Sequence, residues 1–302
     1  MSTSVLRTAD AWWVATPTGA ARIATDARTT AGLLADPAAI AAASVTGETV
    51  PVDSLALVSP ITAPCRLVAQ ATNYASHVRD VGMNPDQTQL TFFRKASGSI
   101  AGPNDDVVRP AHVKLLDYEL EIGLVIGAAM PVGTAVTADN WKDYVAALVV
   151  TNDVSARDVQ LSKIQFFESK SYPTFTPVGP ALVLVNGDEL KRFDDLRLQL
   201  SVNGELRQNA IVGGDMLFPP VEALQALSRF QRLEPGDLVL TGTPAGTALT
   251  SGGKQMELKA FLAAQADNPN FLHDGDVIEA TIGADDGAVD LGRQRNTVRD
   301  AR

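Results

Sequence analysis

Cysteine is nearly absent from this chain: Cys65 is the single one among 302 residues. One thiol excludes an internal disulfide framework and any zinc or iron–sulfur site built from several thiolates. No stretch approaches the roughly 20 apolar residues of a membrane span, and Met1–Asp10 has polar residues where a signal peptide needs an apolar run. These absences favour a cytoplasmic protein that does not enter the membrane.

Basic runs are also missing. The formal net charge is −10, and no block of Lys or Arg forms a stripe that could neutralise a phosphate backbone. We therefore expect no nucleic-acid partner. A small anionic substrate is still compatible with this charge, because a metal ion and a few placed cations set the local potential.

The chain is long enough for one large domain and one small domain. Two prolines in the segment 58–64 suggest a linker, which predicts a small N-terminal α/β domain over residues 1–63 and a main domain over residues 64–302. In the small domain, strand-like pieces at Ala11–Ala15 and Ala21–Ala24 precede a short Ala-rich helix within Ala31–Ala43.

Strand signals dominate the main domain and predict an α+β, mainly β fold. The clearest hairpin joins Leu196–Val202 to Glu205–Ile211 through Asn203-Gly204, which tolerates the positive φ of a type I′ turn. No Gly-x-Gly-x-x-Gly opens a helix after a strand, so a Rossmann domain is not expected. The apolar runs that predict further strands are Leu67–Ala71, Leu120–Ile126, Val145–Val150, Ala181–Val185 and Leu238–Leu240.

Helices are expected at Thr137–Tyr144, which begins with a capping residue, and at Pro220–Phe230, which has proline at its start. The segment Ser251–His273 is interpreted as an insertion with a helical stretch at Met256–Ala266. It could be surface decoration, which we favour, or a cover over a site.

Carboxylates stand out in the motif Asp117-Tyr-Glu-Leu-Glu-Ile-Gly123. Glu119 and Glu121 share one face if this segment is a strand, and like charges on one face repel unless a cation lies between them. A Glu-x-Glu motif on its own usually indicates only that one face of a strand is exposed to solvent. A third carboxylate, Asp153, ends a strand too apolar for the surface, and three oxygen ligands suit Mg²⁺ or Mn²⁺ better than zinc.

Histidine is scarce, with three in the chain, and His77 has Asp80 at helical spacing. Such a carboxylate can orient an imidazole for general-base catalysis, although a surface His beside an acid is the common alternative. Arg157 follows Asp153 by four residues and would face the same way if the stretch were one helical turn; a plain ion pair and substrate binding are equally compatible with it.

Seven blocks, taken in order, resemble the signature of the fumarylacetoacetate hydrolase family from about Pro64 onward: NYASH, TFFRK, DYELEIG, TNDVSARDVQ, ESKSYPTFTPVGP, LEPGDLVLTGTPAG and GDVIEATI. The resemblance implies a mixed β-sheet roll, a homodimer, and Mg²⁺ or Mn²⁺ bound by Glu119, Glu121 and Asp153. It also implies that Arg157, Gln160, Lys170 and Thr243 hold the substrate, and that His77 and Asp80 are catalytic.

Two residues depart from the family pattern: Asp80 stands where many relatives have Glu, and Pro173 where they commonly have Asp. The reaction we expect first is metal-dependent hydrolysis of a C–C bond in a small 1,3-diketo acid, with His77 deprotonating water. Decarboxylation of a 2-keto acid of the oxaloacetate type is the alternative, and a scaffold without catalysis is a third, weaker one.

Overall fold

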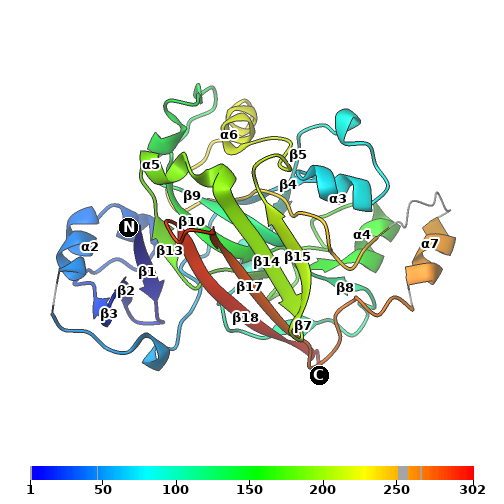
Figure 1. Ribbon diagram of the computed structural model, residues 1–302, viewed down its shortest axis with the longest axis horizontal. Coiled ribbons are helices and arrows are strands. Elements are labelled where there is room, and N and C mark those ends of the chain that lie inside the picture. Colours follow the sequence, from blue (N-terminus) through cyan, green and yellow to red (C-terminus); the bar gives the residue numbers. More distant parts are fainter. Residues whose placement is uncertain (1, 46, 251–257, 266) are drawn as a thin grey trace.

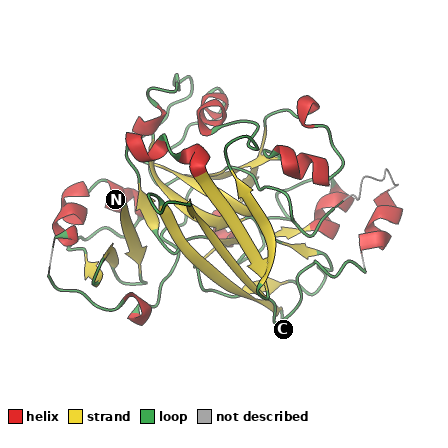
Figure 2. Cartoon of the chain, in the orientation of Figure 1, coloured by secondary structure: helices red, strands yellow, loops and turns green. Residues whose placement is uncertain are grey.

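Two β-sheets packed face to face form the centre of the computed structural model (Figure 1). The structure describes residues 2–45, 47–250, 258–265 and 267–302. Within that part of the chain, no helix has the length and hydropathy needed to cross a bilayer. Strands outweigh helices (Figure 2), which confirms the α+β, mainly β class and the mixed-sheet roll.

The larger sheet has nine strands in the order β3-β2-β1-β13-β10-β9-β16-β4-β5. It is mixed, because β16 runs parallel to β4 while its other neighbour, β9, is antiparallel to it. All five predicted apolar runs lie in this sheet as strands. The strands are β1 Thr3–Arg7, β2 Trp12–Thr16, β3 Gly19–Arg22, β4 Leu67–Ala71, β5 Thr91–Lys95, β9 Leu120–Ile126, β10 Val145–Asn152, β13 Leu182–Leu184 and β16 Leu238–Leu240.

The smaller sheet has five strands in the order β15-β14-β17-β18-β7. Its first two strands are the predicted hairpin, and the turn residues Asn203 and Gly204 have φ of 53° and 80°. The bounds are β7 Val107–Arg109, β14 Leu196–Val202, β15 Glu205–Ile211, β17 Val277–Ala284 and β18 Asp290–Asp300. Two short pairs join β6 Ile100–Ala101 to β12 Thr176–Pro177 and β8 Leu116–Asp117 to β11 Ser155–Ala156.

Seven helices lie in the described ranges, around the sheets: α1 Thr30–Leu34, α2 Pro37–Ser44, α3 Ala75–Asp80, α4 Arg157–Lys163, α5 Gly187–Leu190, α6 Pro220–Ser228 and α7 Leu258–Gln265. The predicted Ala-rich helix is two helices, because Asp36 caps the second one and Pro37 occupies its first turn. The helix predicted at Pro220–Phe230 is confirmed as α6.

The helix predicted at Thr137–Tyr144 is wrong; a single 3-10 turn, Trp141–Asp143, is present instead. The Asn140 side chain accepts a hydrogen bond from the Thr137 N–H at 2.7 Å and donates one to the Ala135 carbonyl at 2.9 Å. Such side-chain-to-backbone bonds compete with helical hydrogen bonds. In the predicted insertion, α7 contacts α4. The ends of the helix predicted there, Met256 and Ala266, lie outside the described residues, as do residues 251–255 and 257.

Each face of the large sheet has its own apolar core. The main core lies between the two sheets, where Ile122 of β9 and Leu198 of β14 are fully buried. On the other face, Val149 and Leu238 pack with Leu33 and Ile40 from α1 and α2. Since Glu121 is on the same face of β9 as Gly123 and Val125, the carboxylate pair continues this second face toward the sheet end.

The N-terminal segment extends the large sheet, because β1 pairs antiparallel with β13 (Figure 1). The first sixty residues therefore share backbone hydrogen bonds with the rest of the molecule. The domain boundary between residues 63 and 64 stays a prediction.

Candidate metal centre and active site

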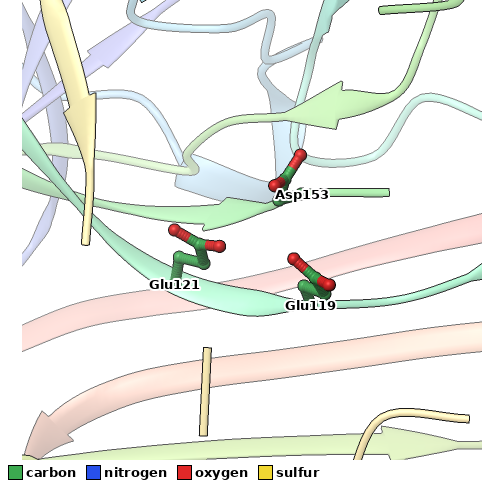
Figure 3. A group of neighbouring side chains, drawn as sticks. All are labelled: Glu119, Glu121 and Asp153. Atoms are coloured by element: carbon green, nitrogen blue, oxygen red, sulfur yellow. The ribbon is translucent and has the colours of Figure 1, made fainter. Parts of the chain in front are cut away.

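Three carboxylates meet where two neighbouring strands end. Glu119 immediately precedes β9, Glu121 lies within it, and Asp153 immediately follows β10. The antiparallel register, with Thr151 opposite Glu121, brings Asp153 beside the pair. Figure 3 shows the three side chains turned toward one another, and one oxygen from each lies within 4.8 Å of the others. All three are buried, so their mutual repulsion is not relieved by water.

Two buried lysines neutralise part of this charge. The Lys170 ammonium donates to Glu119 at 2.7 Å and to Asp153 at 2.6 Å. The Lys95 ammonium contacts the other Asp153 oxygen and donates to the Phe175 carbonyl at 2.8 Å. Burial alone would lower the pKa of Lys170, but the Asp153 and Glu119 carboxylates raise it above its ordinary value.

Arg157 adds a third buried cation. Its Nε donates to Asp117 at 2.8 Å, one terminal nitrogen donates to Glu119 at 2.5 Å, and the other donates to Gln160 at 2.9 Å. Residues 155–156 form a strand and α4 begins at Arg157, so the helical turn considered for residues 153–157 is not formed. Arg157 pairs with Asp117 and Glu119 and not with Asp153.

The two glutamates have opposite electrostatic environments. Burial acts to raise the pKa of Glu119, but the Arg157 guanidinium and then the Lys170 ammonium hold it well below its usual range. For Glu121, burial comes first and the Asp153 and Glu119 carboxylates add to it, so its pKa is raised well above the ordinary value. Glu121 accepts a hydrogen bond from the Gly242 N–H at 2.6 Å.

This arrangement fits a divalent cation. The donors are oxygens, which suits Mg²⁺ or Mn²⁺, and no cysteine or histidine belongs to the group of candidate ligands in the described residues. Among the described residues Glu121 forms no ion pair within 4.0 Å, so it is the one candidate ligand of the three whose carboxylate has no cation beside it. Binding metal at Glu119, Glu121 and Asp153 stays a prediction that the geometry permits.

His77 lies in α3 and borders the same cavity. It is 6% exposed, and burial is the main reason that its pKa falls below the ordinary value; among charged groups, Glu119 acts to raise it and Arg157 to lower it. Within the described residues, Nδ1 of His77 has no hydrogen-bond partner, while Asp80 accepts a bond from the Gly246 N–H at 3.1 Å. The orientation of His77 by Asp80 stays a prediction.

A small cavity of about 60 Å³ connects these groups. Gln160 and Thr243 border it, as expected of substrate-binding residues. The Thr243 hydroxyl donates to the Leu120 carbonyl at 3.0 Å and accepts from Gln208 at 2.8 Å, so its own proton is already engaged. Phe93 and Phe166 form an apolar wall, with their ring centroids 5.1 Å apart.

Comparison with known proteins now identifies the family. Residues 66–299 match the model of the fumarylacetoacetate (FAA) hydrolase C-terminal family. The chain belongs to the fumarylacetoacetate hydrolase family. This confirms the resemblance found in the sequence, and it identifies the carboxylate cluster as part of an enzyme fold.

Several named relatives of this fumarylacetoacetate hydrolase family member are identical to it at about a third of the aligned positions. It is 34% identical over 201 residues to "Oxaloacetate tautomerase Fahd2a, mitochondrial" of Rattus norvegicus, covering 66% of this chain and 62% of that protein. It is 34% identical over 227 residues to "Oxaloacetate tautomerase YisK" of Bacillus subtilis, covering 74% of this chain and 68% of that protein. The chain thus spans less than two thirds of the rat relative's length.

Solved structures share the whole fold. A probable 2-hydroxyhepta-2,4-diene-1,7-dioate isomerase from Mycobacterium abscessus is 32% identical, with a TM-score of 0.79 and full coverage of both chains. A fumarylacetoacetate hydrolase from Exiguobacterium antarcticum is 28% identical, with a TM-score of 0.71 and full coverage of both chains. Family members named for isomerisation, tautomerisation and hydrolysis are therefore all similar to this chain.

Sequence reasoning missed three polar residues of the network in this fumarylacetoacetate hydrolase family member. Lys95 and Asp117 lie within the recognised sequence blocks, but the sequence around them did not show which charged residue each one contacts. Gln208 lies on β15, and its side chain bridges the Leu120 N–H, Thr243 and the Pro244 carbonyl. The sequence of β15 does not alternate between apolar and polar residues, so it gave no signal that Gln208 is buried.

Proposed function

We propose that this protein catalyses keto–enol interconversion of a small dicarboxylic 2-keto acid of the oxaloacetate type. Two relatives with 34% identity are named oxaloacetate tautomerase, and the reaction needs a buried proton acceptor beside a site for a keto oxygen. The proposal takes the oxaloacetate-type substrate expected for the alternative decarboxylase, in place of the 1,3-diketo acid expected for C–C hydrolysis.

The observation that carries the proposal is the balance of buried charge. Four carboxylates, of Asp117, Glu119, Glu121 and Asp153, face three cations, of Lys95, Arg157 and Lys170. Counted with every group ionised, these side chains carry a single excess negative charge, which a divalent cation would change into a single excess positive charge. Burying an unpaired charge is costly, so the loaded site favours an anionic ligand.

The cavity limits the size of that ligand. A volume of about 60 Å³ suits a four-carbon acid better than a long acylpyruvate. The Phe93 and Phe166 rings close one wall, and Gln160 with Lys170 supplies polar groups on the lining. We infer that the substrate's carbon chain packs on the rings while its oxygens face the charged side.

His77 supplies the proton transfer. Because its pKa is lowered, the imidazole is neutral at pH 7 and can accept the proton from the carbon next to the keto group. Returning a proton to the keto oxygen completes the enol, so no atom is gained or lost. A divalent cation bound at the carboxylates would supply Lewis-acid polarisation of that oxygen.

The test follows the loss of enol absorbance when oxaloacetate enol is added to protein with Mg²⁺ or Mn²⁺. We expect acceleration over a blank that contains metal alone, and loss of most of it in His77→Ala. Asn186→Ala, in a distant capping turn, is the matched control with wild-type rates. A wild-type rate equal to the metal blank would overturn the proposal.

Hydrolysis of a 1,3-diketo acid is the second candidate, and the similarity to a solved fumarylacetoacetate hydrolase favours it. Here His77 would deprotonate water, and two acids would be released. Oxaloacetate decarboxylation shares the enolate and releases CO₂. Assaying pyruvate, CO₂ and a panel of acylpyruvates on the same preparation separates the three reactions, and turnover of any of these substrates would exclude the scaffold reading.

A further inference from the structure

A second cavity lies on the seam between the N-terminal strands and the rest of the molecule, away from the carboxylates. It has a volume of about 410 Å³ and is formed by the end of β1, the segment 58–63 and the residues around β6. We call it the seam cavity. The polar residues on its lining that matter here are Arg7, Arg28, Ser59, Thr62, Ser97 and Asp105.

Arg7 brings a half-buried charge to this cavity without a carboxylate partner. Its guanidinium donates to the Ser59 carbonyl at 3.0 Å and stacks over the Trp12 ring at 5.3 Å from the centroid. Among the described residues it has no ion pair within 4.0 Å, and burial lowers its pKa. The bond to Ser59 is the one hydrogen bond that its guanidinium makes within the described part of the chain.

Arg28 is a second cation on the same lining. It also borders a smaller neighbouring cavity together with Arg7, so both arginines line the same two cavities. In the described ranges Arg28 makes no ion pair. The pKa of Asp10 is lowered mainly by the hydrogen bond from the Thr8 hydroxyl, and the positive charge of Arg28 adds a smaller lowering from a longer distance. Two like charges that share one cavity repel, and a bound anion would remove that repulsion.

The remaining polar groups leave room for such an anion. The Ser97 side chain has no hydrogen bond within the described structure, so its hydroxyl can donate. The one carboxylate on the lining, Asp105, is turned to the Gly102 N–H at 2.6 Å. Ser59 and Thr62 are already bonded to Ile61 and Thr30.

We propose that the seam cavity binds a small oxyanion, either a phosphate or a carboxylate group, between Arg7 and Arg28. A guanidinium presents a planar fork of donors that matches two oxygens of such a group. The Trp12 ring and the Ser59 carbonyl hold the Arg7 fork in place before the anion arrives. The site is separate from the proposed keto-acid site and does not depend on it.

The experiment is calorimetric titration of the full-length, Mg²⁺-loaded protein with inorganic phosphate and, separately, with succinate at matched ionic strength. We expect saturable binding of at least one of them, weakened about tenfold or more in Arg28→Gln, as loss of a charge-assisted bond predicts. Arg28 is exposed, so this variant should fold. Arg229→Gln, an exposed arginine just after α6, is the control and should bind as the wild type does.

Arg7→Lys provides an independent test, because it keeps the charge and removes the fork. Binding that is lost in Arg28→Gln and weakened in Arg7→Lys supports the seam cavity, and the tighter of the two probes identifies the source of the oxyanion. Either no binding by the wild type or undiminished binding by Arg28→Gln would overturn the proposal.

Discussion

Two amide substitutions in the carboxylate cluster should have very unequal effects on the stability of the metal-free protein, although each removes a predicted metal ligand. The substitutions are Glu121→Gln and Asp153→Asn. They change size very little, so the difference between them reports on charge. The contacts of each carboxylate determine the expected size of the effect.

Asp153→Asn should destabilise the metal-free protein strongly. Its carboxylate contacts Lys95 and Lys170, whose side chains are 0% and 3% exposed. After the change Lys170 keeps Glu119 at 2.7 Å, whereas Lys95 keeps only the Phe175 carbonyl at 2.8 Å among its described partners. Removing one partner of a buried ion pair costs about 3 to 5 kcal/mol in the free energy of unfolding.

Glu121→Gln should leave the metal-free protein nearly unchanged. The raised pKa of Glu121 means that, without a cation, its carboxyl holds a proton more readily than an ordinary glutamate, and the uncharged glutamine has nearly the same shape as that protonated form. Its amide oxygen can still accept the Gly242 N–H, which Glu121 accepts at 2.6 Å. We expect a change of about 1 kcal/mol or less, the size of one hydrogen bond.

Thermal unfolding in EDTA and in excess Mn²⁺ measures both effects. Asp153→Asn should lower the melting temperature in EDTA by on the order of 10 °C, and Glu121→Gln by a small fraction of that. Mn²⁺ at a hundredfold excess over its Kd should add about 2.7 kcal/mol to the free energy of unfolding of the wild type, and both variants should lose most of this stabilisation. Equal destabilisation of the two variants in EDTA would refute the assignment of charges.

Three further predictions concern other residues. His77→Ala should lower kcat by a factor of about 10² to 10⁴ while Mn²⁺ binding is retained, which kinetics and a metal titration measure. Because burial lowers the pKa of His77, wild-type activity should fall only on the acid side of about pH 6.5, which a pH–rate profile checks. Burial and Asp237 raise the pKa of Cys65 to about 12, so iodoacetamide at pH 8 should alkylate it at least about tenfold more slowly than in guanidinium, as mass spectrometry would show. Light scattering should give about twice 31.9 kDa if the predicted homodimer forms.

Patterns within a few residues of the sequence predicted the strands, turns and helices whose conformation depends on neighbouring residues. The hairpin at Leu196–Ile211 was predicted with its bounds because Asn203-Gly204 accepts positive φ and the first strand alternates strictly. The helix predicted at Thr137–Tyr144 rested on its capping residue and failed, because the Asn140 side chain bonds the backbone of two preceding residues, Thr137 and Ala135. A capping residue does not reveal such a competing side-chain bond.

The carboxylate cluster was predictable in part for the same reason. Glu119 and Glu121 are two residues apart, so strand geometry alone places them together. Asp153 could be added because an apolar strand leads directly to it. The pairing of Asp80 with His77 was inferred from helical spacing and stays a prediction, whereas the bond that Asp80 accepts from the Gly246 N–H is one that no local pattern indicates.

The cations that balance the cluster come from distant parts of the chain. Lys95 lies 58 residues before its partner Asp153, and Arg157 reaches back 40 residues to Asp117. The pairing of these cations decides which carboxylate of the cluster has no ion pair in the described structure, and that carboxylate is Glu121. The charge that a metal would meet at this site therefore depends on tertiary pairing as much as on the acidic motif, and this is why the motif alone predicted the cluster but not the unequal environments of its carboxylates.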